Sequence, residues 1–550
     1  MTQLAPVQQF LSRVQQHPDK VYLRQPVNGV WNEYTWAQVA EQVARMASAL
    51  TALGIKRGDV IATSGRNTAH WIMGDLAALS IGACNVGLYP KMSGEHIEYV
   101  LKHCEAKALL INPAEDVANV VANTPAGVIK IGAPYEEVSC DVDHYWDDLV
   151  QQYDPLPEPV TPDPSDLATL IYTSGTTGDP KGVELRVGGV QWAMTGLVGL
   201  LGDADPEPRW FSYLPLAHVF ERGVVGLASL YMGAEISFLE NLNTFQRDLV
   251  SVQPTRMVGV PLIWQRLQAG ILQKMPEKKL NRLLKIPVLN NIVRKKVKEG
   301  LGLQNTRICI SGAAPLAPAT IEFFTRLGLP ISQGYGMSEN MAYTSIDYPP
   351  RKEPGSVGKA LPGCETKITD DGELLIRHPA VFTGYYKAPD KTAETIEPDG
   401  WMHTGDRARI DDEGYIFITG RVKDLFKTDK GKYVSPVPIE SKLGKNGLIE
   451  SLCLIGAGQK QPVMICTTSE AANDLSDEEV AASIEADVLA LNETLENHEF
   501  IAKTIVSRKQ WTIEDGHYTP TMKVRRHFIE ELYNDQIPTW YKSDSEVIWV

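Results

Sequence analysis

Tyr172-Thr-Ser-Gly-Thr-Thr-Gly-Asp-Pro-Lys-Gly-Val183 is the most informative stretch of this chain. It follows Leu167-Ala-Thr-Leu-Ile171, an apolar run that predicts a buried strand. Four Ser/Thr hydroxyls, three glycines and Lys181 fall within residues 173–182, so hydroxyls, backbone N–H groups and one ammonium can converge on a polyphosphate. The stretch is not a Walker A loop, because Gly182 rather than Ser or Thr follows the lysine. The alternative is a flexible Gly/Ser/Thr loop without a ligand.

Length, charge and cysteine usage narrow the class of protein. At 550 residues the chain is long enough to divide into domains. A net charge of −15 gives no general attraction for a phosphate backbone, so no nucleic-acid partner is expected. The seven scattered cysteines include no Cys-x-x-Cys pair, which predicts a reducing compartment without a zinc site or disulfide framework. With no signal-peptide pattern and no apolar run long enough to span a bilayer, we expect a cytoplasmic enzyme.

The order of helix and strand signals predicts a layered α/β fold. Apolar residues recur at helical spacing over 39–53 and again over 68–79, while 59–63, 84–89 and 106–111 have the pattern of strands. This alternation is typical of a largely parallel sheet covered by helices. Residues 405–420 predict strand, acidic turn and strand, and beyond them short strands alternate with an acidic helix over 476–495. We therefore predict a large domain over residues 1–420 and a small one over 421–550.

Residues 274–298 form the one strongly basic stretch, in which lysines and arginines alternate with Leu, Ile and Val. Such a stretch can lie on an anionic membrane surface, at the inner face of the membrane. The alternative, which is the commoner outcome for a run of charges, is the solvated face of a helix. The sequence favours the second interpretation and leaves the first open.

Further motifs follow the first in a fixed order. They are Leu214-Pro-Leu-Ala-His-Val219, Ser311-Gly-Ala-Ala-Pro315, Gln333-Gly-Tyr-Gly-Met-Ser-Glu339, Gly400-Trp-Met-His-Thr-Gly-Asp406, Gly420-Arg-Val-Lys-Asp424 and Thr519-Pro-Thr-Met-Lys-Val-Arg-Arg526. In this order they resemble the adenylate-forming superfamily of acyl-CoA synthetases, luciferases and peptide-synthetase adenylation domains. Within it, 89–95, 212–222, 427–436 and 516–523 are most similar to long-chain fatty acyl-CoA synthetases. The resemblance implies a large layered α/β domain with a small, mobile α+β C-terminal domain.

The resemblance also implies a reaction in two steps. A fatty acid carboxylate attacks the α-phosphorus of ATP and releases pyrophosphate, and the thiol of coenzyme A then displaces AMP from the acyl-adenylate. The β- and γ-phosphates would be held by Thr173, Ser174, Gly175, Thr176, Thr177, Gly178 and Lys181. Ser338 would donate to the α-phosphate. Glu339 and Thr173 would bind Mg²⁺, since a carboxylate beside a triphosphate is repelled unless a hard cation lies between them.

The resemblance assigns the nucleoside to residues on both sides of the predicted boundary. Gly312, Ala313, Ala314 and Tyr335 would frame the adenine, within a site to which Gln333, Gly334, Gly336 and Met337 also belong. Asp406 would accept hydrogen bonds from the ribose hydroxyls, and Arg421 would approach the ribose. For Arg421 the alternative is an interdomain salt bridge.

The remaining expected site residues act on the carboxylate, on the α-phosphate or in the second step. His218 is expected near the carboxylate with a steric or electrostatic role, because a carboxylic acid is already ionised at neutral pH and needs no base. Lys523 is expected to bridge carboxylate and α-phosphate during adenylation. Lys423 matches the hinge of the superfamily. Lys427, Lys432 and Tyr433 would lie on the coenzyme A side.

Other substrates and acceptors remain open. Relatives commonly carry Ser or Thr and then His after Gly-Val-x-Leu, whereas Arg186 and Val187 follow Leu185 here. A ligase for medium-chain or aryl acids, a fatty acyl-AMP ligase and a β-lactone synthetase are alternatives that keep the adenylation step. A catalytically silent protein on the same fold is a third class, against which the retained charged residues argue.

Overall fold

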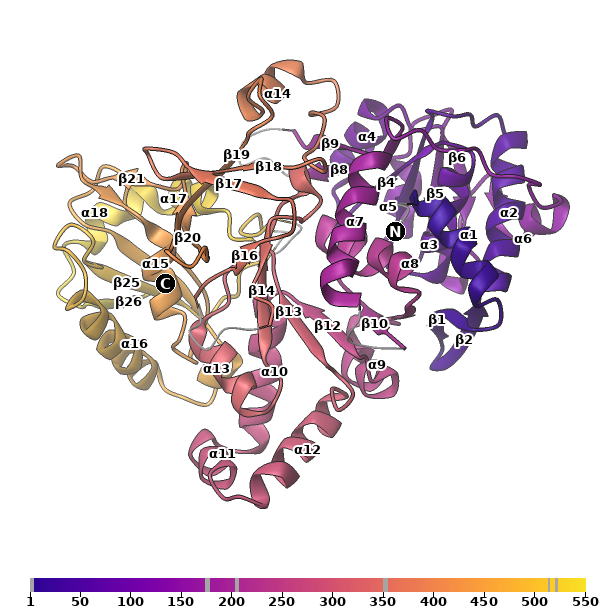
Figure 1. Ribbon diagram of the computed structural model, residues 1–550. Coiled ribbons are helices and arrows are strands. Elements are labelled where there is room, and N and C mark those ends of the chain that lie inside the picture. Colours follow the sequence, from indigo (N-terminus) through magenta and orange to yellow (C-terminus); the bar gives the residue numbers. More distant parts are fainter. Residues whose placement is uncertain (1–3, 174–178, 203–206, 350–354, 513–514, 520–522) are drawn as a thin grey trace.

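The computed structural model describes residues 4–173, 179–202, 207–349, 355–512, 515–519 and 523–550. The expected phosphate-binding residues Ser174, Gly175, Thr176, Thr177 and Gly178 therefore lie outside the described residues. The N-terminal half forms one lobe, and the C-terminal residues form a smaller lobe beside β14 (Ile331–Tyr335) and β16 (Lys359–Ala360) (Figure 1). A helical hairpin of α11 (Glu277–Leu284) and α12 (Leu289–Leu301) projects from the molecule between the two lobes.

A seven-stranded sheet carries the end of the first motif. Its order is β7 (His144–Tyr145), β6 (Ile129–Gly132), β5 (Ala108–Ile111), β3 (Val60–Ser64), β4 (Cys84–Gly87), β8 (Leu167–Thr173) and β9 (Lys181–Arg186). All pairs are parallel except β8 with β9. The largely parallel sheet predicted from the sequence is confirmed. One face packs on α4 (Gly94–His103) and α5 (Val117–Ala122), whose buried residues share a core with the strands.

A nine-stranded sheet forms the second layer of strands. Its order is β16 (Lys359–Ala360), β15 (Ser345–Ile346), β14 (Ile331–Tyr335), β13 (Ile308–Ser311), β12 (Arg256–Gly259), β10 (Arg209–Ser212), β11 (Glu235–Phe238), β1 (Val21–Val27) and β2 (Val30–Thr35). One core cluster joins strands of both sheets with α1 (Pro6–Gln16), α2 (Trp36–Ala52), α3 (Ala69–Ser80), α7 (Val187–Leu201) and α8 (Ala228–Met232). These helices are therefore a layer shared by the two sheets, while α6 (Trp146–Gln152) packs on α2.

The opposite face of the nine-stranded sheet has its own helices. A second core cluster contains α9 (Phe245–Val252), α10 (Pro261–Lys274), α11 (Glu277–Leu284), α12 (Leu289–Leu301) and α13 (Pro318–Arg326). The basic stretch 274–298 thus forms the end of α10 and most of the α11–α12 hairpin. Among the described residues, no helix is long and apolar enough to cross a membrane.

The C-terminal part begins after a third, antiparallel sheet. This sheet has the order β17 (Glu365–Ile368), β18 (Glu373–Arg377), β19 (Met402–Ile410) and β20 (Ile416–Arg421), and the short helix α14 (Pro389–Thr395) precedes β19. The strand–turn–strand predicted over 405–420 is confirmed. A small hairpin of β21 (Phe426–Lys427) and β22 (Tyr433–Val434) follows.

The small C-terminal domain is an α+β sandwich. Its sheet contains β23 (Ile449–Ile455), β24 (Val463–Thr468), β25 (Lys503–Ser507) and β26 (Val547–Trp549). Helices α15 (Pro436–Leu443) and α16 (Asp477–Asn492) cover one face, and α17 (Arg526–Tyr533) and α18 (Ile537–Trp540) cover the other. Helix α16 begins with a capping box between Ser476 and Glu479, followed by an acidic first turn that suits the helix dipole. The boundary at residue 421 stays a prediction.

Candidate active site

The candidate site lies where the ends of β8, β14 and β20 meet the C-terminal part of the chain. Thr173 ends β8, and Lys181 is its cross-strand partner at the start of β9. The hairpin therefore brings the two flanks of the predicted phosphate loop together. Of that loop, the structure describes these flanks and not residues 174–178.

Lys181 lies among charges of both signs. Its Nζ is 5.0 Å from the ring centroid of Tyr385. Burial lowers the pKa of Lys181, as do the positive charges of Lys391 and Lys423, while the carboxylates of Glu339 and Glu394 raise it. The cations gathered around Lys181 make this region suited to an anion.

Glu339 faces the same region from the turn η5 (Ser338–Asn340). The hydroxyl of Tyr385 donates a hydrogen bond of 2.8 Å to its Oε1, and the backbone oxygen of Glu339 accepts from Phe382 N at 2.7 Å. Ser338 beside it is buried. Tyr385 was missed by the sequence analysis, because it belongs to none of the motifs. It acts through Glu339 and is thus a positioning residue.

Three backbone positions shape the segments expected to frame the adenine. Ala313 has φ of 67°, a left-handed conformation that is unusual without glycine and typical of functional sites. At Gly336 an added Cβ would lie 2.5 Å from the backbone carbon of Ala342, so only glycine allows this close approach. Gly312 packs more loosely, because an added Cβ would lie 3.1 Å from the Phe220 ring, a tight contact with a side chain and not with backbone.

The Gln333 side chain is used within the protein. Its Oε1 accepts from Leu316 N at 2.7 Å, and its Nε2 donates to Ser356 O at 3.0 Å. Gln333 therefore fixes the loop that follows Ala314. Its side chain holds this loop in place through hydrogen bonds within the protein. Gly334 and Met337 lie in the same segment, where Met337 N donates to Asn340 Oδ1 at 3.0 Å.

Asp406 accepts hydrogen bonds from two other expected residues. Tyr335 donates its hydroxyl to Asp406 Oδ2 at 2.6 Å, and Arg421 Nε donates to Oδ1 at 2.8 Å. Arg421 thus forms an ion pair within one sheet, as a cross-strand pair between β19 and β20. The interdomain salt bridge considered for Arg421 stays a prediction, as the domain boundary does. Each carboxylate oxygen can accept a second hydrogen bond, so the pair does not prevent Asp406 from accepting from a ribose.

His218 lies in the loop between β10 and the π-helix η3 (Phe220–Leu227). Its Nδ1 accepts from Phe220 N at 3.2 Å, which leaves Nε2 as the ring nitrogen that carries the proton. Burial, and to a smaller extent the charge of Lys523, lowers the pKa of His218 to about 3. The imidazole is therefore neutral at physiological pH. Its expected steric or electrostatic role beside the carboxylate stays a prediction.

A buried polar network holds the His218 loop. Glu221 is fully buried on η3 and accepts from Ser212 Oγ at 2.6 Å. Asn67 donates to Leu214 O at 2.6 Å and accepts from Leu216 N at 3.0 Å. Burial raises the pKa of Glu221 to about 8, although the hydrogen bond from Ser212 opposes this. Glu221 is consequently a protonated carboxyl at neutral pH.

The pKa of Glu221 predicts how stability depends on pH. Between its usual value of 4.5 and about 8, folded Glu221 holds a proton that the unfolded chain releases, so its contribution to stability falls as pH rises. Burial lowers the pKa of His70 and of His218 from 6.5 to about 3. Their contribution to the free energy of unfolding therefore falls only when the pH drops below 6.5. Above that value, Glu221→Gln is expected to remove a slope of roughly 1.4 kcal/mol per pH unit in the free energy of unfolding. Urea unfolding of the unaltered chain and of Glu221→Gln from pH 6.5 to 8 measures this difference in slope. If the free energy of unfolding changed with pH equally in the two proteins, a buried, protonated Glu221 would be contradicted.

Lys523 brings the C-terminal domain to the site. Its backbone exchanges hydrogen bonds with Thr519, whose Oγ1 accepts from Lys523 N at 3.1 Å. Lys523 as a whole residue is exposed. Burial around its ammonium nevertheless lowers its pKa, and the positive charge of Arg421 lowers it further. Asp406 and Glu339 act on it in the opposite direction. Lys523 therefore lies within electrostatic reach of residues from the N-terminal domain.

The structure does not bring the expected coenzyme A residues to this cluster. Lys427 and Tyr433 are cross-strand partners in the β21–β22 hairpin, with Lys427 Nζ 4.9 Å from the Tyr433 ring centroid. Lys427, Lys432 and Tyr433 are all exposed. Lys423, at the expected hinge, is also exposed and acts on the pKa of Lys181. The hairpin thus forms a separate, solvent-facing surface in this conformation.

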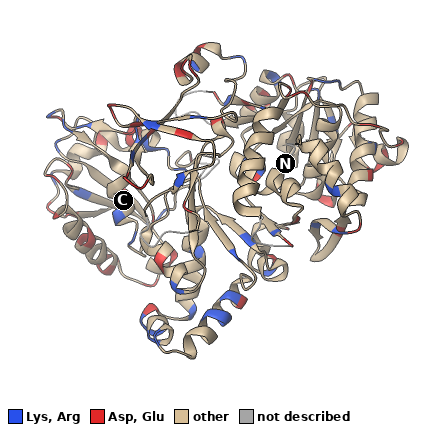
Figure 2. Ribbon diagram, viewed as in Figure 1, with Lys and Arg blue, Asp and Glu red and all other residues tan. Residues whose placement is uncertain are grey.

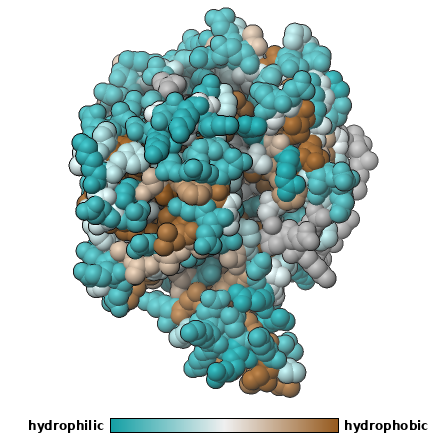
Figure 3. Space-filling view, turned by 90° about the vertical axis from the view of Figure 1, so that its left-hand side faces the viewer, coloured by the Kyte–Doolittle hydropathy of each residue, from teal (hydrophilic) through white to brown (hydrophobic). Residues whose placement is uncertain are grey.

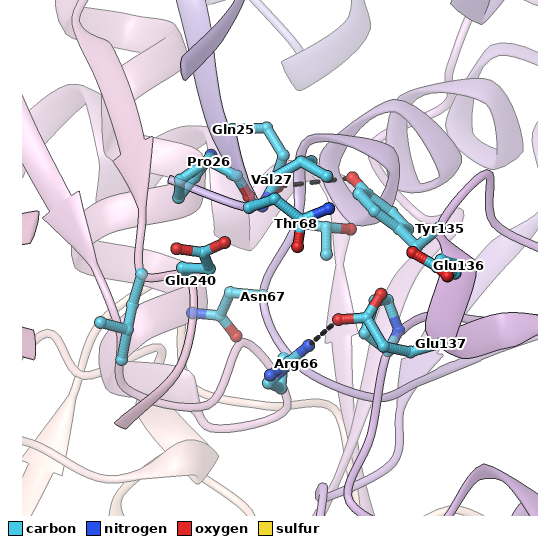
Figure 4. A pocket seen from close by; sticks show the side chains of 13 residues that line it. Gln25, Pro26, Val27, Arg66, Asn67, Thr68, Tyr135, Glu136, Glu137 and Glu240 are labelled. Atoms are coloured by element: carbon cyan, nitrogen blue, oxygen red, sulfur yellow. Dashed lines mark hydrogen bonds and ion pairs between the residues drawn. The ribbon is translucent and has the colours of Figure 1, made fainter. Parts of the chain in front are cut away.

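A cavity elsewhere in the N-terminal domain is unrelated to these residues. It has a volume of about 370 Å³ and lies between the ends of β1, β3 and β5. Figure 4 shows Arg66 turned toward Glu137, with which it forms an ion pair of 3.0 Å at the cavity wall. None of the residues expected from the sequence lines this cavity. We therefore place the candidate site at the Lys181–Lys523 cluster and not here.

Comparisons with known proteins extend over nearly the whole chain. The family model of the AMP-binding enzyme matches residues 10–386, and that of the AMP-binding enzyme C-terminal domain matches 407–545. A long-chain-fatty-acid–CoA ligase of Xenopus laevis is 29% identical over 618 residues, covering 97% of this chain and 83% of that protein. Fatty acyl-CoA synthetase A of Dictyostelium discoideum is 30% identical over 594 residues, covering 94% and 87%.

The fold is also found among solved structures. The anthranilate CoA ligase in complex with anthranoyl-AMP matches with a TM-score of 0.80 at 20% sequence identity, covering 97% of this chain and 98% of that chain. At this identity the likeness shows the fold alone. It confirms the predicted arrangement of a large N-terminal α/β domain with a small C-terminal domain.

Proposed function

The chain belongs to the AMP-binding enzyme family, and from this premise we propose that it is a long-chain fatty acid–CoA ligase. Membership makes it an adenylate-forming acid–CoA ligase that binds ATP. The proposal adds the substrate: a fatty acid is joined to AMP with release of pyrophosphate, and coenzyme A then takes the acyl group and releases AMP. Both full-length relatives described above are named for fatty acyl substrates, which supports this class of acid.

The observation that carries the proposal is the convergence of cations on Glu339 and Asp406. Arg421 of β20 is ion-paired with Asp406 at 2.8 Å. Lys181 of β9 interacts electrostatically with Glu339, and Lys523 of the C-terminal domain interacts with both carboxylates. Adenylation brings a carboxylate and a triphosphate together, so it needs positive charge that is placed before the reaction. In our proposal Lys523 bridges carboxylate and α-phosphate, and neutral His218 shapes the space beside them.

The residues present fit a requirement for Mg²⁺. The Glu339 carboxylate and the Thr173 hydroxyl are oxygen donors, and Tyr385 orients the carboxylate through one of its two oxygens. In the described residues no group of three or more His, Cys, Asp or Glu could hold a metal ion. Mg²⁺ commonly takes one or two protein oxygens and fills its other positions with phosphate and water. When bound, it would neutralise phosphate charge; Glu339 and Thr173 would hold it.

The remaining assignments complete the proposal. Ser338 would donate to the α-phosphate, Ala313 and Ala314 would line the adenine, and the Asp406–Arg421 pair would face the ribose. For the second step we propose rotation of residues 421–550 about Lys423. This rotation would bring Lys427, Lys432 and Tyr433 from the surface to the coenzyme A side.

The product and the range of acids test the proposal. The formation of AMP and acyl-CoA is measured with ATP, Mg²⁺ and coenzyme A for a series of acids from acetate to oleate. We expect the rate to be greatest for the long-chain acids. A best substrate of medium length or an aryl acid would replace the substrate part of the proposal. Pyrophosphate release without acyl-CoA would indicate another acceptor, as in a fatty acyl-AMP ligase or a β-lactone synthetase, and absence of turnover with every acid would contradict the proposal.

A further inference from the structure

The α11–α12 hairpin carries a concentration of positive charge on an acidic protein. Residues 274–298 contain nine lysines and arginines and one acidic residue, Glu277, in a chain with net charge −15. Glu277 pairs with Arg326 on α13 at 3.2 Å, outside the hairpin. In the part of the chain that the structure describes, no carboxylate lies within 4.0 Å of the charged nitrogens of Lys278, Lys279, Arg282, Lys285 or Lys296. In the ribbon of Figure 2 the projecting helices carry several of the blue segments that mark lysine and arginine.

The end of the same hairpin exposes apolar side chains. Ile286, Val288, Leu289 and Ile292 are 43%, 74%, 37% and 46% exposed. We call residues 285–292 the hairpin tip. They hold four of the twelve large exposed apolar residues seen in the described part of the chain. In Figure 3 the hydrophobic colour at the lowest point of the molecule marks this projection. A cluster of this kind on a projecting element is typical of an interaction surface.

The tip contributes little to the core beneath it. The hairpin is anchored by Leu280 and Leu301, which are buried, and by Leu284, Val293 and Val297, which pack on the second core cluster. None of the four tip residues belongs to that cluster. Polar substitutions at the tip can therefore change its interactions while the fold stays intact.

We propose that the hairpin tip docks on the surface of an anionic lipid bilayer. Apolar side chains at a convex end can enter the boundary between headgroups and acyl chains, while surrounding lysines and arginines remain at the phosphates. A protein partner fits less well, because protein interfaces are depleted of lysine and need a complementary surface for each side chain. A bilayer accepts the same residues without such complementarity. The basic surface would also orient an otherwise acidic protein, with this hairpin toward the membrane.

Flotation with lipid vesicles tests the proposal on the full chain. Binding is expected to vesicles of phosphatidylcholine with phosphatidylglycerol, and to be weaker to phosphatidylcholine alone. Raising salt from about 0.1 M to about 1 M is expected to release much of the protein, since exposed charges are then screened. The double variant Val288→Ser/Ile292→Ser is expected to lower the vesicle partition coefficient at least about tenfold. Lys285→Glu/Lys296→Glu is expected to lower it by roughly tenfold or more.

Matched variants distinguish the tip from general surface properties. Leu242→Ser changes an apolar residue that is 72% exposed outside the hairpin, and Lys542→Glu reverses an exposed charge beyond α18. Both are expected to bind vesicles as the unaltered chain does. Failure of the unaltered chain to float with anionic vesicles would overturn the proposal, as would equal binding by the tip variants. A tip-dependent change in sedimentation velocity without vesicle binding would also overturn it, by showing that a second copy covers the tip.

Discussion

Lys523→Ala is expected to reduce adenylate formation by roughly 10²–10³-fold, the loss typical of removing one group that stabilises transition-state charge. The ammonium of Lys523 interacts electrostatically with Glu339, Asp406 and His218, all from the N-terminal domain. In our proposal it works only in the first step. Thioester formation from supplied acyl-adenylate and coenzyme A is therefore expected to stay within about threefold of the unaltered enzyme, since no such charge is then needed from Lys523. Pyrophosphate release and acyl-CoA formation, measured separately, check the two steps.

A matched lysine shows whether the loss depends on position. Lys460 lies exposed in the same domain, between β23 and β24, and has no assigned role. Lys460→Ala is expected to keep both steps. Equal losses in the two steps for Lys523→Ala would contradict the division of labour that we propose, and full adenylation by this variant would remove Lys523 from the site. Thermal unfolding of both variants separates these outcomes from loss of the fold.

The layers of the fold were predictable where the signals are local. Alternating strand and helix patterns predicted the parallel sheet around β3, β4 and β5, and the turn between β19 and β20 is visible in the sequence. The pairing of β1 with β11 was not predictable. It joins Leu23 to Ile236 across more than 200 residues, and no local pattern specifies such a partner. The layer of helices shared by two sheets follows from pairings of this kind.

The charged residues of the candidate site could be expected from the sequence, because they belong to recognisable motifs. Lys181, Glu339, Asp406 and Lys523 were expected from their motifs, and the structure brings all four within electrostatic reach of one another or of common partners. Tyr385 was not, because its role depends on a contact with Glu339 across 46 residues. The Asn67–Ser212–Glu221 network could not be predicted either, because Asn67 lies far from Ser212 and Glu221 in the sequence. The sequence alone also does not show whether a glutamate will be solvated or buried.

Glu339→Gln is expected to lower adenylation by about 100-fold and to raise the Mg²⁺ concentration needed for half-maximal rate, because a neutral amide is a weak ligand for a hard cation. Tyr385→Phe removes the 2.8 Å hydrogen bond that orients this carboxylate while leaving its charge in place. Its expected loss is smaller, about three- to tenfold, and it should also appear in the Mg²⁺ dependence. Initial rates of pyrophosphate release across a Mg²⁺ series at saturating ATP measure both effects.

A neighbouring carboxylate provides the control for this prediction. Glu394 is exposed and its charge also acts on Lys181, but it belongs to α14 and not to the η5 turn. Glu394→Gln therefore changes the same local field by one charge and is expected to leave the Mg²⁺ dependence unaltered. If Glu339→Gln lowers the rate with no shift in that dependence, the carboxylate acts through the field alone and does not hold the ion. If Glu394→Gln and Glu339→Gln shift it equally, the effect is general electrostatics, and the metal must be assigned to other residues.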